Sequence, residues 1–284
     1  MKTLIIGSKG MLGSELMSEF STFHPLGVDI EQLDITKPEM IEKFFQKENP
    51  DLVINAAAYT NVDACEENQE IAYEVNGQAP GFLAKYCRQF GAKLIHYSTD
   101  YVFNGQKKSG YDEDDKPDPV SVYGKSKLLG EQLIQEQTDN FYILRTAWLY
   151  GPNGPNFVKT MLDLAEKEKS ASGRSPEGRE IKVVNDQHGS PTFAKDLAQK
   201  TKAIIEQNKD FGIYHTTNAG HCTWYDLSEE IFKITKKEIK LIAVNSDQFP
   251  RPAPRPKYSI LNNNKLKPLR NWKKALKDYL ENEL

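Results

Sequence analysis

The sequence predicts an α/β protein in which a doubly wound parallel sheet is followed by a smaller, mostly C-terminal lobe. Three observations support this fold class. Short apolar runs alternate with amphipathic stretches from the first residue, glycines separate the first apolar run from the first helical pattern, and the alternation loosens after residue 150. Strands that are apolar throughout and separated by helices form parallel sheets with helices on both faces.

The strands of the sheet are predicted from short apolar runs at 4–6, 26–28, 52–54, 94–97 and 142–144. Between these runs apolar residues recur at the spacing of a helix, as in 11–20 and 40–45. The alternation covers residues 1–150, which we expect to form the core domain. Parts of 181–215 are expected to complete it.

The remaining residues, 151–284, are predicted to form mainly the second lobe and a C-terminal helix. Proline and glycine cluster after Tyr150, and a long polar stretch predicts an exposed loop at 168–179. The elements expected beyond this loop are a strand at 181–184, a helix starting near Thr192, an extended proline-rich segment crossing the surface at 251–256, and an amphipathic helix from Trp272.

Composition argues against several classes of protein. The chain has 284 residues, 38% hydrophobic and 27% charged, which is enough for a sizeable core. A net charge of −3 argues against a broad basic face that would bind nucleic acid. The N-terminal apolar run stops at Gly7, too short for a signal peptide or a membrane span, so we expect a soluble, cytoplasmic protein. The cysteines and histidines show no metal-ligand spacing, so no metal site is predicted.

A glycine loop, Gly7-Ser8-Lys9-Gly10-Met11-Leu12-Gly13, joins the first strand to the first helix. A helix N-terminus offers free N–H groups and partial positive charge to a phosphate, and glycines let the backbone approach it closely. The alternative is a tight strand-to-helix turn without a ligand. The G-x-x-G-x-x-G spacing is the form seen in extended short-chain dehydrogenase/reductases, and it predicts a Rossmann-like, NAD(P)-binding core.

Two residues bear on the choice of nicotinamide cofactor. Asp29 ends the second strand, where an acid can hydrogen-bond the adenosine ribose and favour NADH. Lys9 lies in the glycine loop and offers a cation to the 2′-phosphate of NADPH. The sequence therefore leaves NADPH and NADH open. Small residues at 55–58 follow the third strand and leave room for the cofactor, although tight helix packing would give the same pattern.

Tyr123 and Lys127 lie at positions i and i+4 of a predicted helix and therefore share one face. A phenol with a pKa of about 10 is a poor acid or base at neutral pH unless a cation stabilises its phenolate, which Lys127 can do. Thr99 ends an apolar strand 24 residues earlier, where active sites open in such sheets. Its hydroxyl can donate to a substrate carbonyl while Tyr123 delivers a proton. These groups predict hydride transfer between a nicotinamide and a carbonyl.

Several segments, spread over nearly the whole chain, carry a resemblance to a known family. They are Gly7-x-x-Gly10-x-x-Gly13, Asn55-Ala56-Ala57-Ala58-Tyr59-Thr60, the stretches 96–103, 122–127, 145–150 and 185–192, and Arg255-Pro256. Together they resemble the dTDP-4-dehydrorhamnose reductases. The resemblance implies reduction of the C4 ketone of dTDP-4-dehydro-6-deoxy-L-mannose to dTDP-L-rhamnose, with NADPH or NADH as cofactor. It also implies a dTDP-sugar partner and a homodimer as one form of assembly.

The resemblance further implies roles for individual residues. Tyr123 is the implied proton donor, Lys127 a cofactor ligand that modulates the phenol's pKa, and Thr99 the partner of the carbonyl. The implied sugar-nucleotide site comprises Thr99, Asp100, Trp148 and Arg255. The implied cofactor site comprises Tyr123, Lys127, Gly7, Lys9, Gly10, Met11, Leu12, Gly13, Asp29, Asp34, Ile35, Ala58, Tyr59 and Thr60. Purely structural roles, as a core residue and a loop cap, are the alternatives for Trp148 and Asp34.

Two departures from the family pattern concern a loop and the assembly. The stretch at 168–179 is longer than the usual connection, and we interpret it as a solvated insertion. Some members form a metal-bridged dimer through glutamates; Glu15 matches one of these, but Lys195 stands where another is expected. The alternative functions are another sugar-nucleotide reductase or epimerase of the superfamily, and a non-catalytic regulatory subunit resembling that of methionine adenosyltransferase.

Overall fold

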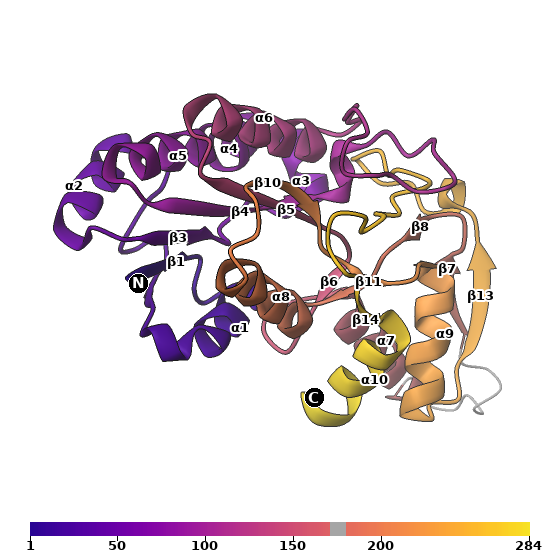
Figure 1. Cartoon of the computed structure of the whole chain (residues 1–284). Helices are drawn as coiled ribbons and strands as arrows, with labels where there is room; N and C mark the ends of the chain where they lie inside the picture. Colours follow the sequence, from indigo (N-terminus) through magenta and orange to yellow (C-terminus); the bar gives the residue numbers. More distant parts are fainter. Residues whose placement is uncertain (171–179) are drawn as a thin grey trace.

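The computed structural model describes residues 1–170 and 180–284 and is built around a six-stranded parallel sheet (Figure 1). Across the sheet the strands are β10 (Gly212–His215), β5 (Phe141–Thr146), β4 (Lys93–Thr99), β3 (Leu52–Asn55), β1 (Thr3–Ile6) and β2 (Leu26–Val28). The chain runs outward from β1 to β2 on one side and from β3 to β4 and β5 on the other, so the strand order reverses between β1 and β3. The predicted doubly wound parallel sheet is confirmed, and its strands include all the predicted apolar runs.

Helices cover both faces of the sheet (Figure 1). On one face lie α2 (Pro38–Glu48), α5 (Ala79–Phe90) and α6 (Val122–Gln137), and on the other α1 (Met11–Glu19) and α8 (Ala194–Glu206). Both faces need this cover because side chains alternate along a strand: Leu4 and Ile6 belong to one apolar cluster and Ile5 to the other. The shorter connecting elements are η1 (Ser21–Phe23), α3 (Val62–Glu67), α4 (Gln69–Tyr73), the π-helical turn η2 (Glu74–Gln78) and η3 (Asp100–Val102).

A smaller lobe follows β5 and has a core of its own. Its paired strands are β6 (Leu149–Tyr150) with β9 (Thr192–Phe193), β7 (Glu180–Val184) with β13 (Lys240–Val244), β8 (His188–Gly189) with β12 (Cys222–Thr223), and β11 (Asn218–Ala219) with β14 (Leu269–Asn271). Its helices are α7 (Phe157–Ser170), α9 (Trp224–Thr235), η5 (Ser246–Gln248) and α10 (Trp272–Asn282). Tyr150, Phe193 and Tyr279 are buried against one another in its centre, with ring centroids 5.4–5.6 Å apart.

Three details of this lobe correct the sequence prediction. The loop predicted at 168–179 is wrong at its start, because α7 continues to Ser170; glutamate and lysine favour helix even without apolar neighbours. Residues 171–179 of that prediction lie outside the described residues. The helix expected near Thr192 begins at Ala194, since Thr192 belongs to β9. The segment 251–256 forms neither helix nor strand, as predicted, but it does not lie wholly on the surface, because Ala253 is buried.

Helix α6 is tied to the sheet by a buried ion pair. Glu131 of α6 and Arg145 of β5 make two parallel contacts, Nε to Oε1 at 2.9 Å and Nη2 to Oε2 at 2.7 Å. The third guanidinium nitrogen, Nη1, donates to the Glu113 carbonyl oxygen at 3.3 Å. Each nitrogen of this buried arginine therefore has an acceptor, as a charge removed from water requires. Gly130 permits the close approach of α6 to η2, because a Cβ at this position would lie 2.3 Å from the Asn76 carbonyl oxygen.

Among the described residues, no helix has both the length and the apolar character needed to cross a membrane.

The ion pair predicts a large loss of stability for Glu131→Gln. The substitution keeps the shape of the side chain but leaves the Arg145 charge buried without its counterion, which costs roughly 3–5 kcal/mol of unfolding free energy. Urea denaturation followed by circular dichroism measures this loss. The matched control is Glu281→Gln, which breaks the exposed pair with Lys277 at 3.8 Å and should leave the denaturation midpoint nearly unchanged. Equal midpoints for the two variants would contradict the structural role given to the buried pair.

Candidate active site

The carboxyl ends of β1, β3, β4 and β5 meet at one edge of the sheet. Gly7 and Asp100 come directly after β1 and β4, and Thr99 is the last residue of β4. In open parallel sheets, ligands bind at this edge where the strand order reverses. That reversal lies between β1 and β3, so the edge next to the glycine loop is where a ligand site is expected.

A cavity of about 320 Å³ lies at this point. It is lined by Ile6, Gly7, Gly10, Asp29, Ile30, Leu33, Asp34, Ile35, Thr36, Ala56, Ala57, Ala58 and Val75. The structure thus brings Gly7, Gly10, Asp29, Asp34–Ile35 and Ala58 together, as the sequence suggested. It adds apolar walls that the sequence analysis did not assign, among them Leu33 and Val75.

The glycine loop is packed so closely that Gly13 admits no side chain. A Cβ there would lie 1.9 Å from the Gly7 carbonyl oxygen. Gly10 is the N-cap residue of α1 and offers no side-chain cap, so the first N–H groups of the helix, which begins at Met11 and continues through Leu12, are left for an external partner. The loop is therefore built to receive an anion at the helix N-terminus.

Asp29 and Lys9 meet through the backbone of the loop. The Asp29 Oδ2 atom accepts from the Ser8 hydroxyl at 2.8 Å and from the Lys9 backbone N–H at 3.1 Å. The Lys9 ammonium points outward and pairs with Glu31 at 3.4 Å, with 70% of the side chain exposed. Asp34 lines the cavity but also caps its own turn, since its Oδ1 accepts from both the N–H and the hydroxyl of Thr36.

The Ala58-Tyr59-Thr60 segment is held by Asn76, a residue the sequence analysis missed. The Asn76 Oδ1 atom accepts from the Tyr59 N–H at 2.8 Å, and its Nδ2 donates to the Tyr59 carbonyl at 3.0 Å and to the Ser126 hydroxyl at 3.2 Å. Asn76 lies in η2, so this one side chain connects Tyr59, which follows the cavity-lining Ala58 but does not itself line the cavity, with α6. Thr60 is exposed and does not line the cavity.

Tyr123 and Lys127 lie one turn apart near the start of α6, which Ser121 caps by accepting from the Gly124 N–H. Tyr123 is half-buried and meets the Tyr101 ring edge-on at 5.7 Å. Lys127 is 2% exposed, and burial lowers its pKa to about 8. The Lys127 Nζ atom donates to the Tyr97 carbonyl at 2.6 Å and lies 3.1 Å from His96 Nε2.

Thr99, Asp100 and Tyr123 form a small polar group at the end of β4. The Thr99 hydroxyl donates to Asp100 Oδ1 at 2.9 Å and accepts from the Tyr101 N–H at 3.1 Å. Burial raises the pKa of Tyr123 and the nearby Asp100 adds to this, while a hydrogen bond to Thr99 opposes it. Burial also raises the pKa of Asp100, to about 6. At neutral pH the phenol therefore holds its proton and can give it to an acceptor.

Trp148 lies between the two lobes and is half-buried. Its backbone is left-handed, with φ of 46°, an uncommon conformation for a tryptophan. The indole stacks on Trp224 of α9 with centroids 3.4 Å apart and planes at 7°, and it lies directly against Gly189. Trp148 is thus part of an aromatic platform whose second member, Trp224, the sequence analysis did not identify.

Arg255 is anchored beside Tyr101, the residue whose ring packs on Tyr123. Its Nη2 donates to Asp63 Oδ1 of α3 at 2.9 Å, and its guanidinium lies over the Tyr101 ring at 5.8 Å. Arg251 adds a longer contact to Asp63, at 3.7 Å. The Arg255 Nη1 atom is buried and has no hydrogen-bond partner among the described residues. Asp63 was not predicted, because no local pattern marks an acid that pairs with an arginine so far along the chain.

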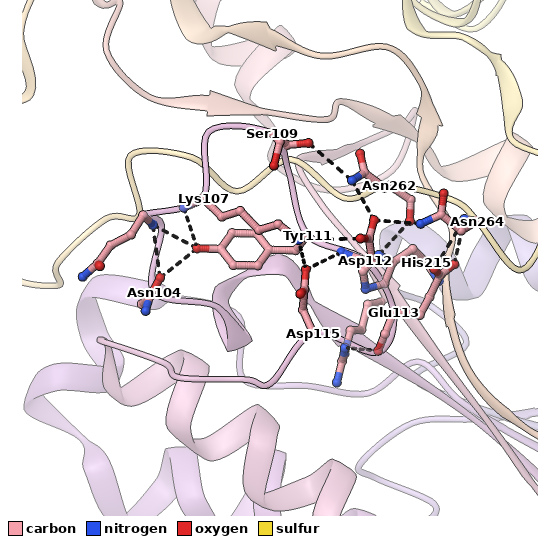
Figure 2. Close-up of polar contacts among 12 residues, drawn as sticks. Asn104, Lys107, Ser109, Tyr111, Asp112, Glu113, Asp115, His215, Asn262 and Asn264 are labelled. Atoms are coloured by element: carbon pink, nitrogen blue, oxygen red, sulfur yellow. Dashed lines mark hydrogen bonds and ion pairs between the residues drawn. The ribbon is translucent and has the colours of Figure 1, made fainter.

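The chain after Arg255 is fastened to the loop that follows β4 (Figure 2). Asp112 Oδ1 accepts from the side-chain amides of Asn262 and Asn264, at 2.9 and 2.7 Å. The buried Glu113 carboxylate accepts from the backbone N–H groups of Asn264 and Lys265, at 3.1 and 3.2 Å through Oε1. These contacts hold the C-terminal segment, and with it Arg255, next to the carboxyl edge of the sheet.

Glu15 and Lys195, the two residues that bear on a metal-bridged dimer, lie close to the C-terminus. Lys195 Nζ pairs with Glu283 at 2.5 Å. Burial raises the pKa of Glu15, and Glu283 adds to this while Lys195 opposes it. Within residues 1–170 and 180–284 there is no group of three or more acidic, histidine or cysteine side chains arranged to hold a metal ion.

Known proteins resemble this chain over its full length. A family model described as the RmlD substrate binding domain matches residues 1–284. The crystal structure of a dTDP-4-dehydrorhamnose reductase from Clostridium acetobutylicum is similar, with 40% identity, a TM-score of 0.91 and 99% of each chain covered. A dTDP-4-dehydrorhamnose reductase from Bacillus anthracis, solved in complex with NADP, has 36% identity and a TM-score of 0.91, again with 99% of each chain covered. A probable dTDP-4,6-dihydroxy-2-methyloxan-3-one 4-ketoreductase from Streptomyces antibioticus is 39% identical over 98% of this chain and 94% of its own length. This chain therefore belongs to the RmlD substrate binding domain family.

Proposed function

We propose that this protein is an NAD(P)H-dependent oxidoreductase that reduces the C4 ketone of dTDP-4-dehydro-6-deoxy-L-mannose to dTDP-L-rhamnose. The observation that carries the proposal is the group at the end of β4, where Thr99 and its partner Asp100 lie near the Tyr123 phenol at the edge of the sheet where ligands are expected. Two relatives named dTDP-4-dehydrorhamnose reductase, at 40% and 36% identity, support the choice of substrate.

The residues around the 320 Å³ cavity fit a nicotinamide dinucleotide. The uncapped N-terminus of α1 suits the pyrophosphate, and Asp29 lies at the end of β2, where an acid meets the adenosine ribose. Met11, Leu12 and Gly13 would contribute backbone, Lys9 a cation, and Asp34–Ile35 and Ala58-Tyr59-Thr60 the flanking walls. When bound, the cofactor supplies the hydride that reduces the carbonyl carbon.

The chain's own contribution to the reaction is the proton and its placement. Tyr123 holds its proton at neutral pH and donates it to the ketone oxygen as negative charge develops there. Lys127 lies one turn away and, in its protonated form, favours the phenolate that remains. The single Thr99 proton is directed at Asp100, so Thr99 must turn that O–H toward a bound carbonyl in order to donate to it.

In this proposal the two lobes bind different ligands. Residues 1–150, completed by α8 and β10, would hold the dinucleotide, and residues 151–284 would mainly hold the sugar nucleotide, with Asp100, Trp148 and Arg255 facing it. The buried and unpaired Nη1 of Arg255 supports this placement, because a buried donor calls for an acceptor. The homodimer and the cytoplasmic location stay predictions drawn from the resemblance and from the short N-terminal apolar run.

The second candidate is a reductase for a different dTDP-linked keto sugar. The relative from Streptomyces antibioticus favours it, because that 4-ketoreductase is named for another sugar at 39% identity. Incubating the protein with dTDP-4-dehydro-6-deoxy-L-mannose and NADPH or NADH tests both candidates. Loss of the absorbance of NADPH or NADH with formation of dTDP-L-rhamnose supports the proposal. Turnover of another keto sugar alone supports the second candidate. An isomerised sugar without net oxidation would indicate an epimerase, and no turnover would favour a regulatory subunit.

Tyr123→Phe should lower kcat by on the order of 10²–10⁴-fold, because the ring stays in place but the proton donor is lost. Cofactor affinity, measured by quenching of protein fluorescence, should stay close to that of the wild type. The matched control is Tyr73→Phe, which removes a phenol from the same apolar cluster and should leave kcat unchanged. Near wild-type turnover by Tyr123→Phe would remove this residue from its role.

Lys9→Ala should weaken the binding of NADPH by about fivefold and the binding of NADH much less, because only NADPH carries a 2′-phosphate. The effect is modest because the ammonium is solvent-exposed. Asp29→Asn should do the reverse and favour NADPH, since it removes a charge that repels the phosphate but retains an oxygen to accept from Ser8 and Lys9. Dissociation constants for both cofactors measure the effect. Equal changes for NADPH and NADH would show that neither residue faces the 2′ position.

Trp148→Ala should raise the KM for the sugar nucleotide roughly tenfold, because an indole offers a flat apolar face to a deoxysugar. NADPH affinity should be unchanged. Trp224→Ala is the comparison variant, since it removes the stacked partner from behind Trp148 and should lower the melting temperature more than it changes KM. If Trp148→Ala lowers the melting temperature but leaves the kinetics unaltered, Trp148 is a core residue outside the site.

A further inference from the structure

His96 occupies a buried position between two strands and the helix that carries Lys127. It is 1% exposed and lies on β4 opposite Asn55 of β3 in the register of the sheet. Its Nδ1 atom lies 3.1 Å from Asn55 Nδ2, and its Nε2 atom lies 3.1 Å from Lys127 Nζ. Asn55, His96 and Lys127 therefore form one continuous chain of polar contacts that ends at the proposed active site.

The direction of the hydrogen bond between Asn55 and His96 follows from the orientation of the Asn55 amide. Its Oδ1 atom accepts from the Ala57 N–H at 3.2 Å, so the amide presents its NH₂ group to the ring. His96 Nδ1 must then act as the acceptor. Burial, reinforced by Lys127, holds the pKa of His96 well below its usual range, so the ring is neutral and carries one proton. That proton resides on Nε2, the atom facing Lys127.

The second contact then restricts the charge of Lys127. An ammonium group has donors only and cannot accept from the Nε2–H, whereas a neutral amine has one lone pair that can. Lys127 Nζ already donates to the Tyr97 carbonyl at 2.6 Å, which a neutral amine can also do. Protonating Lys127 would require the His96 proton to reside on Nδ1 and the Asn55 amide to turn over. The charge of Lys127 and the tautomer of His96 are therefore coupled.

We propose that His96 is a positioning residue for Lys127: held in one orientation by Asn55, its Nε2–H donates to Lys127 Nζ and stabilises the neutral amine. This role rests on the proposed function, in which Lys127 supports proton transfer by Tyr123. A lysine that exchanges its proton near the working pH is more useful there than one that is always charged. The lowered pKa of Lys127, about 8, agrees with this arrangement.

Other charges near Lys127 are accounted for by their own partners. On α6 itself, Glu131 raises the pKa of Lys127, but its carboxylate is paired with Arg145 of β5. Asp100 of η3 is buried; its Oδ1 accepts from Thr99, whereas its Oδ2 has no hydrogen-bond partner among the described residues. Among the described residues, His96 is the titratable side chain within hydrogen-bond distance of Nζ, so a substitution of His96 should change the pKa of Lys127 directly.

Nuclear magnetic resonance of the substrate-free protein tests the proposal without any variant. With the histidine rings labelled with ¹⁵N, the chemical shifts distinguish a protonated ring nitrogen from an unprotonated one. At about pH 9, above the Lys127 pKa of about 8, His96 should carry its proton on Nε2, and on titration to lower pH the proton should move to Nδ1 as Lys127 becomes charged. A proton on Nδ1 at about pH 9 would overturn the proposal.

Variants then test the effect on Lys127, whose titration is followed with ¹³C-labelled lysine and assigned by loss of the signal in Lys127→Met. His96→Leu should move the titration midpoint about one pH unit higher, because the hydrogen bond to the neutral amine is lost. His96→Gln keeps an N–H donor and should restore a midpoint near that of the wild type. His215→Leu, which removes a buried histidine on β10 that contacts the Asn262 carbonyl, is the control and should not move it.

An unchanged or lower midpoint in His96→Leu would refute this role of His96, as would a His96→Gln midpoint that matches His96→Leu. In the folded variants the pH profile of kcat should shift with the Lys127 midpoint. Because the titrations use no sugar nucleotide, their outcome does not depend on which substrate the enzyme reduces. Intact titrations together with absent turnover would overturn the proposed function and leave the His96–Lys127 coupling in place.

Discussion

The close packing of α6 against the sheet is the constraint on which the site depends. On its other side α6 packs closely on η2, where Gly130 leaves no room for a Cβ beside the Asn76 carbonyl, and this packing helps to place Tyr123 and Lys127 at the end of β4. The Glu131–Arg145 pair fixes the height of the helix above β5 with two short contacts. Both devices lie within the turn that follows Lys127, so an error in the packing of this helix becomes an error in the position of the reacting groups.

The same packing sets the electrostatics of the site. An amphipathic surface helix would face the sheet with apolar side chains, but α6 buries Lys127 and Glu131 there instead. Glu131 is compensated by Arg145, whereas the hydrogen-bond contacts of Lys127 among the described residues are a carbonyl oxygen and a neutral imidazole. Burial without a counterion brings the pKa of Lys127 close to neutrality, and burial holds the proton on Tyr123. Part of the buried face of α6 is therefore polar. It holds Tyr123 protonated and places Lys127, with a pKa near neutrality, one turn away.

Much of the fold and the core of the site could be predicted from the sequence because their signals are local. The apolar runs and the glycine spacing mark β1 to β5 and the start of α1, and the i, i+4 spacing places Tyr123 and Lys127 on one turn. The residues that were missed act across long separations in the chain: Asn76 reaches Ser126, and Arg255 reaches Asp63, 192 positions away. No local pattern encodes such pairs. The helical residues 168–170 were mistaken for loop because a polar stretch without apolar periodicity fits either state.

The C-terminal segment connects the second lobe to the first. Arg255 belongs to the second lobe in sequence, yet it pairs with Asp63 of α3 and lies over Tyr101, whose ring packs on Tyr123. This return is secured further along by Asp112 and Glu113, which bind the backbone and amides of residues 262–265 (Figure 2). If the proposed function holds, a sugar nucleotide bound between the lobes would be enclosed by a segment whose position is set by residues of the first lobe.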